Sequence, residues 1–263
     1  GIINMPAGLQ ASGMAAGDAV RVMYYLVAGI GLLTGLLLLF GLQGKTKLQI
    51  EQRHGFVEII RDGLKAARDP GIALSYGAAF VSRGDMAIVG TFLVLWGTIY
   101  GTSTLGLDVT VAARKAAMPV IVAQSIALLT APLFGILTDR INRVSALTIA
   151  LLISAVGYSS TILVPNPYSP MMYVSAVLIG LGEIGGVITS GVLIAQQAPK
   201  MVRGAVIGFF GLAGAVGILI GSKLGGFLFD RWLPAGPFVI FGIFGFVVFF
   251  WSLLVKHKVV PPE

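Results

Sequence analysis

The sequence predicts an all-α, polytopic membrane protein, and three observations support this prediction. Of the 263 residues, 56% are hydrophobic and only 11% are charged, with a mean hydropathy of +0.93. Soluble domains carry about 25% charged residues, so this composition excludes a soluble enzyme, a nucleic-acid-binding module and a disordered chain. Seven apolar stretches are long enough to cross a bilayer, which takes roughly 20 residues. None of them alternates apolar and polar residues, as the strands of a membrane barrel do.

The seven predicted spans follow one another with a single long interruption. Short connections separate the last six, and several of these carry proline turn signals such as Pro165, Pro199 and Pro234. The spans are about Val20–Leu42, Ile72–Tyr100, Val111–Leu137, Val144–Val164, Met171–Ala195, Gly204–Phe229 and Pro237–Val255.

The one long connection, residues 43–71, is expected to be a cytoplasmic linker that contains an amphipathic helix at about Ile50–Arg68. Its charged residues fill one predicted face, and the sequence Asp69-Pro70-Gly71 ends the helix. Such a helix would tether two membrane bundles. The residues expected on the apolar face, which recur at helical spacing, are Arg53, Phe56, Val57, Ile60, Leu64 and Ala67.

This order predicts the end of one bundle joined to the whole of a second. Residues 1–19 are expected to be an outer loop left from a truncated N-terminal half, and residues 20–42 its last membrane helix. Residues 72–255 would form a six-helix transporter bundle, and residues 256–263 a cytoplasmic tail. The chain begins with Gly1 and has no signal segment, so we interpret it as a fragment of a longer protein.

The formal net charge of +7 follows from topology. Threading the spans alternately places twelve Lys and Arg residues on one side of the bilayer. By the positive-inside rule that side is cytoplasmic, and the C-terminus is expected to lie there. We expect the protein to reside in the cell membrane (plasma or inner membrane). Nucleic acid is therefore not expected as a partner. The other side receives only four basic residues, Arg21, Arg114, Lys115 and Arg231.

Few residues in this chain could support catalysis or metal binding. It has no cysteine, and its two histidines, His54 and His257, lie far apart in polar segments. Thiol chemistry and cysteine-based metal sites are thereby excluded. We expect no catalytic residue, no metal and no cofactor.

A loop between the third and fourth spans carries a recognisable pattern. It reads Gly135-Ile-Leu-Thr-Asp139-Arg140-Ile-Asn142-Arg143-Val144. This resembles the signature loop of the major facilitator superfamily, G-x-x-x-D-R/K-x-G-R-R/K, in the copy found in the second half of its members. Asn142 replaces a glycine, and Val144 replaces a basic residue. The span order and the long linker resemble that family as well.

The resemblance implies a transporter half that contains family helices six to twelve. The missing N-terminal half of the same protein would be its partner. The loop would act in gating, with Gly135 letting helix ends approach and Asp139 meeting an arginine or a helix N-terminus. Arg140 and Arg143 would anchor its cytoplasmic side. The simpler alternative is a basic topology anchor.

Glycines recur every three or four residues in the sixth span, which predicts a continuous groove along one helix face. Close backbone approach is a main source of helix association in lipid. We therefore expect tight packing along the whole stripe, which would also allow helices to slide. The packing candidates are Gly204, Gly208, Gly211, Gly217 and Gly221, with Gly214 and Gly225 in the same series.

Three ionisable residues, Arg83, Asp85 and Glu183, lie near the middle of predicted spans. Asp85 and Glu183 are about 20 and 18 Å along their helices, in a hydrocarbon core about 30 Å thick. A charge there costs roughly 2.5–3.5 kcal/mol and usually faces a cavity or a partner. Arg83 and Asp85 point to nearly opposite faces. The resemblance places all three on helices that line the central cavity, and without the facing bundle we expect them to be exposed.

Together these features predict a secondary active transporter, a symporter or antiporter, that moves a small solute by alternating access. Proton coupling through Asp85 or Glu183 would energise it, while Arg83 and Glu183 could contact the solute. The intramembrane residues could alternatively form a structural ion pair or a protonated, buried carboxyl. Two other functions stay open: an integral-membrane enzyme that acts on lipid-linked substrates, and a channel.

Overall fold

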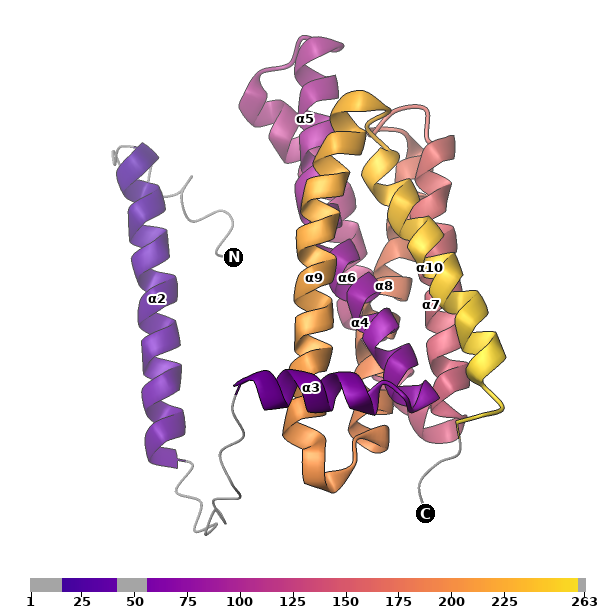
Figure 1. Ribbon diagram of the computed structural model, residues 1–263. Coiled ribbons are helices and arrows are strands. Elements are labelled where there is room, and N and C mark those ends of the chain that lie inside the picture. The colour runs from indigo at the N-terminus through magenta and orange to yellow at the C-terminus, as the bar shows by residue number, and fades with distance from the viewer. Residues whose placement is uncertain (1–15, 42–55, 260–263) are drawn as a thin grey trace. The chain divides into compact units, whose positions relative to one another are not determined.

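The computed structural model describes residues 16–41 and 56–259 (Figure 1). The chain divides into two compact units, residues 1–53 and 54–263, which we describe separately. Helices account for 88% of the described residues, and no strand occurs among them. The prediction of an all-α polytopic protein is confirmed.

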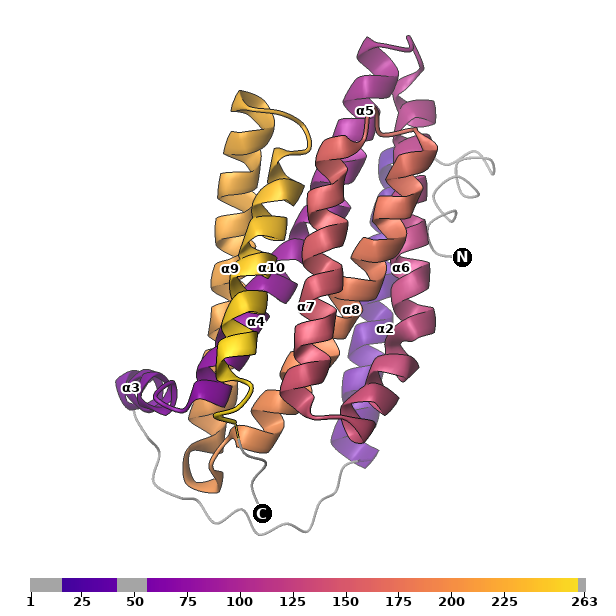
Figure 2. The ribbon, with the colours of Figure 1, turned by 90° about the vertical axis from the view of Figure 1, so that its right-hand side faces the viewer.

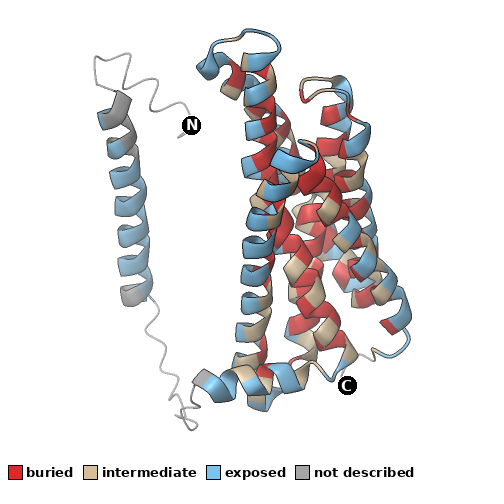
Figure 3. Cartoon of the chain, turned by 45° about the horizontal axis from the view of Figure 1, so that its top comes forward, coloured by how far each residue is buried: buried red, intermediate tan, exposed pale blue. Residues whose placement is uncertain are grey.

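The first unit contains one described helix, α2 (Ala16–Gly41). It covers the first predicted span but begins four residues earlier, so residues 16–19 are helical and not part of an outer loop. The rest of that predicted loop, residues 1–15, lies outside the described residues. The described residues 24–38 of α2 are all exposed, Leu33 for example by 61% (Figure 3). Such a helix needs lipid or other helices to cover it.

In the second unit, the described residues 56–259 include six helices that are long and apolar enough to cross a membrane. They match the six remaining predicted spans to within a few residues at each end, as expected for helix boundaries. The first is continuous from α4 (Pro70–Ile88) through a π-helical turn η2 (Val89–Leu93) to α5 (Val94–Ser103). The others are α6 (Val109–Arg140), α7 (Arg143–Ser160), α8 (Pro170–Gln197), α9 (Arg203–Arg231) and α10 (Gly236–Val255).

Two central helices organise this bundle. Helix α8 packs on α6, α7 and α4, and α4 packs in turn on α9 and α10. Figure 2 shows α7, α8 and α10 side by side with α6 and α9 toward the flanks. The core lies between them and is built from large, fully buried side chains, among them Leu147, Tyr158, Met172, Phe238 and Phe241. Short 3₁₀ turns, η3 (Thr161–Leu163) and η4 (Lys200–Val202), join the helices.

Side-chain caps fix where three of these helices begin. The Asp69 carboxylate accepts hydrogen bonds from the backbone N–H groups of residues 71 and 72, at 2.8 and 3.0 Å. Residues 70 and 71 therefore open α4 and do not belong to the linker. Asp108 caps α6, and hydrogen bonds from Thr110 hold the pKa of its carboxyl below the usual value. Asn142 accepts from the Val144 N–H at 2.9 Å and caps α7.

A shorter helix, α3 (Phe56–Ala66), confirms that the predicted linker contains a helix. It lies across the bundle against α9 (Figure 1). Gly63 makes this approach possible, because a Cβ there would lie 2.7 Å from the Cβ of Phe209. The Tyr76 hydroxyl donates a hydrogen bond to the Gly63 carbonyl at 3.1 Å. Residues 42–55, including Arg53 and His54, lie outside the described residues.

The predicted apolar face of α3 packs on the bundle only in part, through Ala67 but not through its larger members Val57 and Leu64. Val57 and Leu64 are 76% and 55% exposed, whereas Gly63 is buried and Ala66 and Ala67 pack beside α9. Small side chains form the contact face because they let the two helices approach closely. The larger apolar residues are left on the outside.

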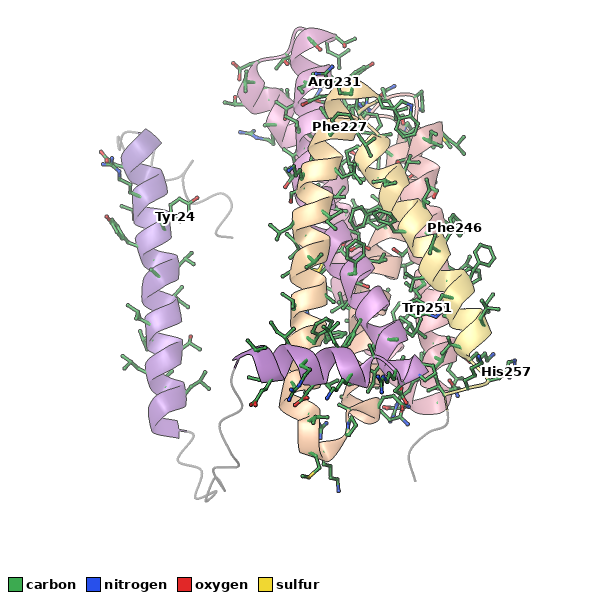
Figure 4. All side chains as sticks on the ribbon, viewed as in Figure 1. Tyr24, Phe227, Arg231, Phe246, Trp251 and His257 are labelled. Atoms are coloured by element: carbon green, nitrogen blue, oxygen red, sulfur yellow. The ribbon has the colours of Figure 1, made fainter. Side chains whose placement is uncertain are left out.

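The two ends of the bundle differ in charge. Arg231 lies at one end and His257 at the other (Figure 4). The His257 end also receives the connections from α6 to α7 and from α8 to α9, with Arg140, Arg143, Lys200 and Arg203. These are basic residues that the sequence prediction put together on one side of the membrane.

Candidate functional site

Two buried carboxyl groups meet inside the bundle. Asp85 of α4 is 1% exposed and Glu183 of α8 is 3% exposed, and the two interact electrostatically. Counted from Pro70 and Pro170, they lie about 22 and 20 Å along their helices. Both are therefore near the middle of a hydrocarbon core about 30 Å thick.

Glycines of α8 bring the neighbouring helices close to Glu183. A Cβ at Gly180 would collide with the carbonyl of Ala123 on α6, and one at Gly182 with the backbone of Ser154 on α7. On the α4 side, a Cβ at Gly186 would lie 2.5 Å from the Ser82 hydroxyl oxygen. The glycines thus hold Glu183 where three helices converge on α8.

Three further polar side chains complete this site. Gln124 Nε2 of α6 donates to Glu183 Oε1 at 3.3 Å, and Ser154 Oγ of α7 donates to Asp85 Oδ2 at 3.4 Å. The Tyr158 hydroxyl, also on α7, interacts electrostatically with both carboxyl groups. We call these five residues, Asp85, Gln124, Ser154, Tyr158 and Glu183, the acid cluster.

The acid cluster has unused hydrogen-bonding capacity. Asp85 Oδ1, Glu183 Oε2 and the Tyr158 hydroxyl are buried and have no hydrogen-bond partner within the part of the chain that the structure describes. Buried polar atoms are usually paired, so unpaired ones call for an explanation. Three of them in one cluster indicate a site that can take up a proton or a ligand.

Arg83 lies apart from the two acids, in keeping with the opposite faces expected for Arg83 and Asp85. Its side chain is exposed, and its Cγ would lie 2.7 Å from a Cβ built at Gly214 of α9. Residues two positions apart in a helix differ by about 200° around its axis, so Arg83 and Asp85 leave α4 in nearly opposite directions. Neither ion pair given by the described residues, Arg21 with Asp18 and Arg61 with Asp62, involves the cluster.

The expected exposure of the acids is also wrong. Asp85 and Glu183 are buried by α4, α6, α7 and α8 of this chain itself, with no contribution from a second bundle. The reason is that both carboxyls lie between helices of one bundle and not on its open face. Only Arg83 of the three candidates is exposed as predicted.

Sequence reasoning overlooked Gln124, Ser154 and Tyr158. Each is a polar residue inside an apolar span, which is a usable signal, but many such residues make only local bonds. Thr130, for example, donates to the carbonyl of Ile126 in its own helix. Only the packing of α6 and α7 against α8 shows which polar residues reach the carboxyls.

Among the described residues no group of three potential metal ligands occurs.

The predicted gating loop lies at the basic end of the bundle. Asp139 and Arg140 end α6, Asn142 caps α7 and Arg143 begins it. A cavity of about 210 Å³ lies beside the loop, and both Asp139 and Arg143 line it. No described atom lies within 4 Å of a Cβ built at Gly135, so the expected close approach there is absent from the described structure.

The glycine stripe of α9 divides into two parts. A Cβ at Gly217 would collide with the carbonyl of Phe80 on α4, and Gly221 lies against Phe241 and Gly84. At Gly204, Gly208 and Gly211, by contrast, a Cβ would meet no described atom within 4 Å. The packing prediction is correct for the second part only.

Comparison with known proteins supports this architecture. Residues 115–263 match the family model of the Major Facilitator Superfamily. The chain is 28% identical over 191 residues to the magnetosome protein MamH of Paramagnetospirillum magneticum, covering 72% of this chain and 44% of MamH.

Two further relatives match shorter segments. The magnetosome protein MamZ of Magnetospirillum gryphiswaldense is 31% identical over 174 residues, covering 66% of this chain and 27% of MamZ. The multidrug resistance protein MdtG of Klebsiella pneumoniae is 30% identical over 135 residues, covering 51% and 32%. The chain thus spans less than half the length of these relatives. Because the family match extends over more than half of its residues, the chain belongs to the Major Facilitator Superfamily of membrane transporters.

Proposed function

We propose that this chain is the C-terminal half of a secondary transporter that moves a small solute by alternating access, energised by protons that bind at the acid cluster. The observation that carries the proposal is the buried pair of Asp85 and Glu183, which have no cationic partner among the described residues. The missing N-terminal half would complete the solute path. The basic end of the bundle would face the cytoplasm of the cell membrane.

The charge of the pair supports proton binding. Burying one isolated carboxylate is costly, and two that interact cannot both stay ionised without a cation. A proton on one carboxyl removes the repulsion and converts an acceptor into a donor. That donor could pair with the unpartnered oxygen of the other carboxyl or with Tyr158.

The location of the pair supports coupling to conformational change. Asp85 and Glu183 belong to α4 and α8, the two central helices of the bundle, and their bonds to Ser154 and Gln124 are long, at 3.4 and 3.3 Å. A small shift of either helix would change these bonds and the separation of the carboxyls. Rocking of one bundle against the other could thereby load and release the proton.

Arg83 suggests the side from which the solute approaches. An exposed arginine in the middle of a span is costly in lipid, so it is expected to face a water-filled path or another helix bundle. Arg83 would then contact an anionic group of the solute, while the acids serve the proton.

Infrared spectroscopy of the purified full-length protein tests proton binding without a known solute. A protonated carboxyl in an apolar site gives a carbonyl stretch separate from that of carboxylates. We expect such a band in the wild type, and its loss or shift in Asp85→Asn or Glu183→Gln. Asp230→Asn, in the last turn of α9 and far from the acid cluster in the sequence, is the matched control and should leave the band unchanged.

Transport measurements test the coupling itself. With a labelled solute in proteoliposomes, at least one of the two variants should abolish accumulation driven by a pH gradient and keep exchange at equal concentrations. Normal accumulation by both variants would show that the acid cluster is structural.

A further inference from the structure

The outward face of α3 combines apolar and basic side chains. Val57 and Leu64 are exposed, and Arg61, Lys65 and Arg68 lie between and beside them at helical spacing. Together with Ile60, these residues line a shallow depression of about 470 Å³. Neither acid of α3, Glu58 or Asp62, lines it. Arg61 Nε lies 3.8 Å from Asp62 Oδ1, which makes a long ion pair.

An apolar groove of about 490 Å³ adjoins this depression between α3 and α9. Ile60 lines both, so the two hollows lie on either side of this residue of α3. Gly208 and Gly211 keep the groove wide, because a side chain at either position would project into unoccupied space. The remaining lining residues are Ile59, Phe209, Leu212 and Ala215.

The orientation of these hollows fits one leaflet of a membrane. Helix α3 runs across α9 (Figures 1 and 2), so it lies roughly in the plane of a bilayer that α9 crosses. The groove residues Gly208 to Ala215 lie about 8–18 Å along α9 from its start at Arg203. In a bilayer that α9 spans, that depth would correspond to the acyl-chain region, and the exposed basic residues on and just after α3 would reach the head groups.

We propose that α3 and α9 form a binding site for an anionic phospholipid of the cytoplasmic leaflet. Arg61, Lys65 and Arg68 bind the phosphate of the head group, because basic side chains at the membrane surface attract anionic lipids. An acyl chain fills the apolar groove and covers Gly208 and Gly211. Val57 and Leu64 insert among neighbouring lipids, which removes their apolar surface from water.

Lipid is favoured over a protein partner because charge and apolar surface alternate on the same narrow face. A phospholipid presents both features at this spacing, with its phosphate beside its acyl chains. The competing occupant is the N-terminal half of the protein, and the experiments below distinguish the two.

Native mass spectrometry of the full-length protein, with added palmitoyl-oleoyl phosphatidylglycerol or phosphatidylcholine, measures the preference for anionic lipid. We expect the triple variant R61Q/K65Q/R68Q to reduce this preference about tenfold. The matched control is R114Q/K115Q, which neutralises two exposed basic residues near the start of α6, at the other end of the bundle. This variant should retain the preference for anionic lipid. Gly211→Leu, which fills the groove, should weaken the binding of both lipids.

Three results would overturn the proposal. The first is an unchanged preference in the triple variant, and the second is displacement of the lipid by an equal concentration of inorganic phosphate. The third comes from a nitroxide at Leu64→Cys in the otherwise unaltered full-length protein. If lipid covers this face, the label should collide with dissolved oxygen. Protection of the label from both oxygen and aqueous nickel would instead show that it is buried against the N-terminal half, and would overturn the proposal.

Discussion

Helices α8 and α9 have similar compositions but different environments. Both are long, apolar and rich in glycine, yet 56% of the residues in the most apolar part of α8 are buried, against 22% in α9. The glycines of α8 contact α4, α6 and α7, whereas the first three glycines of the α9 stripe contact nothing that the structure describes. Glycine spacing therefore shows where a helix can be approached, but not whether a partner is there.

The same difference governs the charged residues. Glu183 is enclosed because the glycines around it admit three neighbouring helices. Arg83 packs the start of its side chain against Gly214 of α9, and the residue stays exposed because no described helix covers the rest of it. A buried carboxyl is suited to binding a proton, and an exposed guanidinium to binding a solute or a second bundle.

The largest expected effect on stability comes from adding a side chain at a glycine of α8 that contacts a neighbouring helix. Gly182→Ala would place a Cβ inside the backbone of Ser154, so helix α7 must move. We expect a loss of unfolding free energy on the order of 3 kcal/mol, measured by denaturant unfolding of the full-length protein in detergent. Gly191→Ala on the same helix is the control, since a Cβ there meets no described atom within 4 Å. Equal stability of the two variants would contradict the described packing.

Within α9 the two parts of the glycine stripe should respond differently. Gly217→Ala collides with the Phe80 carbonyl and should cost about 2 kcal/mol, while Gly211→Ala should be neutral or slightly stabilising. Thermal unfolding of both variants measures the contrast. A comparable loss in Gly211→Ala would show that a part of the protein outside this chain covers that face.

Neutralising a buried acid should stabilise the protein. Asp85→Asn or Glu183→Gln keeps the side-chain size and removes the cost of a buried charge, so we expect a gain of about 1–2 kcal/mol. Unfolding of each variant and of the double variant would measure it. A loss of stability would mean that the carboxyls form essential structural bonds and would weaken the coupling proposal.

The smallest contrast concerns the starts of α4 and α8. Asp69→Ala removes two cap hydrogen bonds and should cost about 1 kcal/mol. Ser169 begins α8 without any side-chain cap bond, so Ser169→Ala should change stability by only a few tenths of a kcal/mol. Circular dichroism during thermal unfolding compares them, and equal losses would contradict the described caps.

Much of the fold could be predicted because a membrane imposes simple rules. Each membrane helix must satisfy its own backbone hydrogen bonds and reach across the hydrocarbon core, so apolar length alone located the six spans of the second unit. The positions of short connections, such as that from Arg140 to Arg143, can also be predicted from the sequence. Asn142, which departs from the family pattern, serves as the N-cap of α7.

The candidate site was predicted only in part. Mid-span position identified Asp85 and Glu183, because charge in an apolar stretch is conspicuous. Helical spacing also separated Arg83 from Asp85. Neither signal could show that the two acids interact with each other, or that Gln124, Ser154 and Tyr158 surround them. These contacts join residues up to 98 positions apart, as between Asp85 and Glu183.

The sequence by itself determined the membrane class, the helices and the candidate residues, since these depend on local composition and on the thickness of the bilayer. Tertiary structure alone decided which faces are covered. It buried Asp85 and Glu183, left Arg83 open, and turned Val57 and Leu64 of α3 away from the bundle. Side-chain burial depends on which helices pack together, and that choice follows from the fit of whole surfaces such as Gly182 against Ser154.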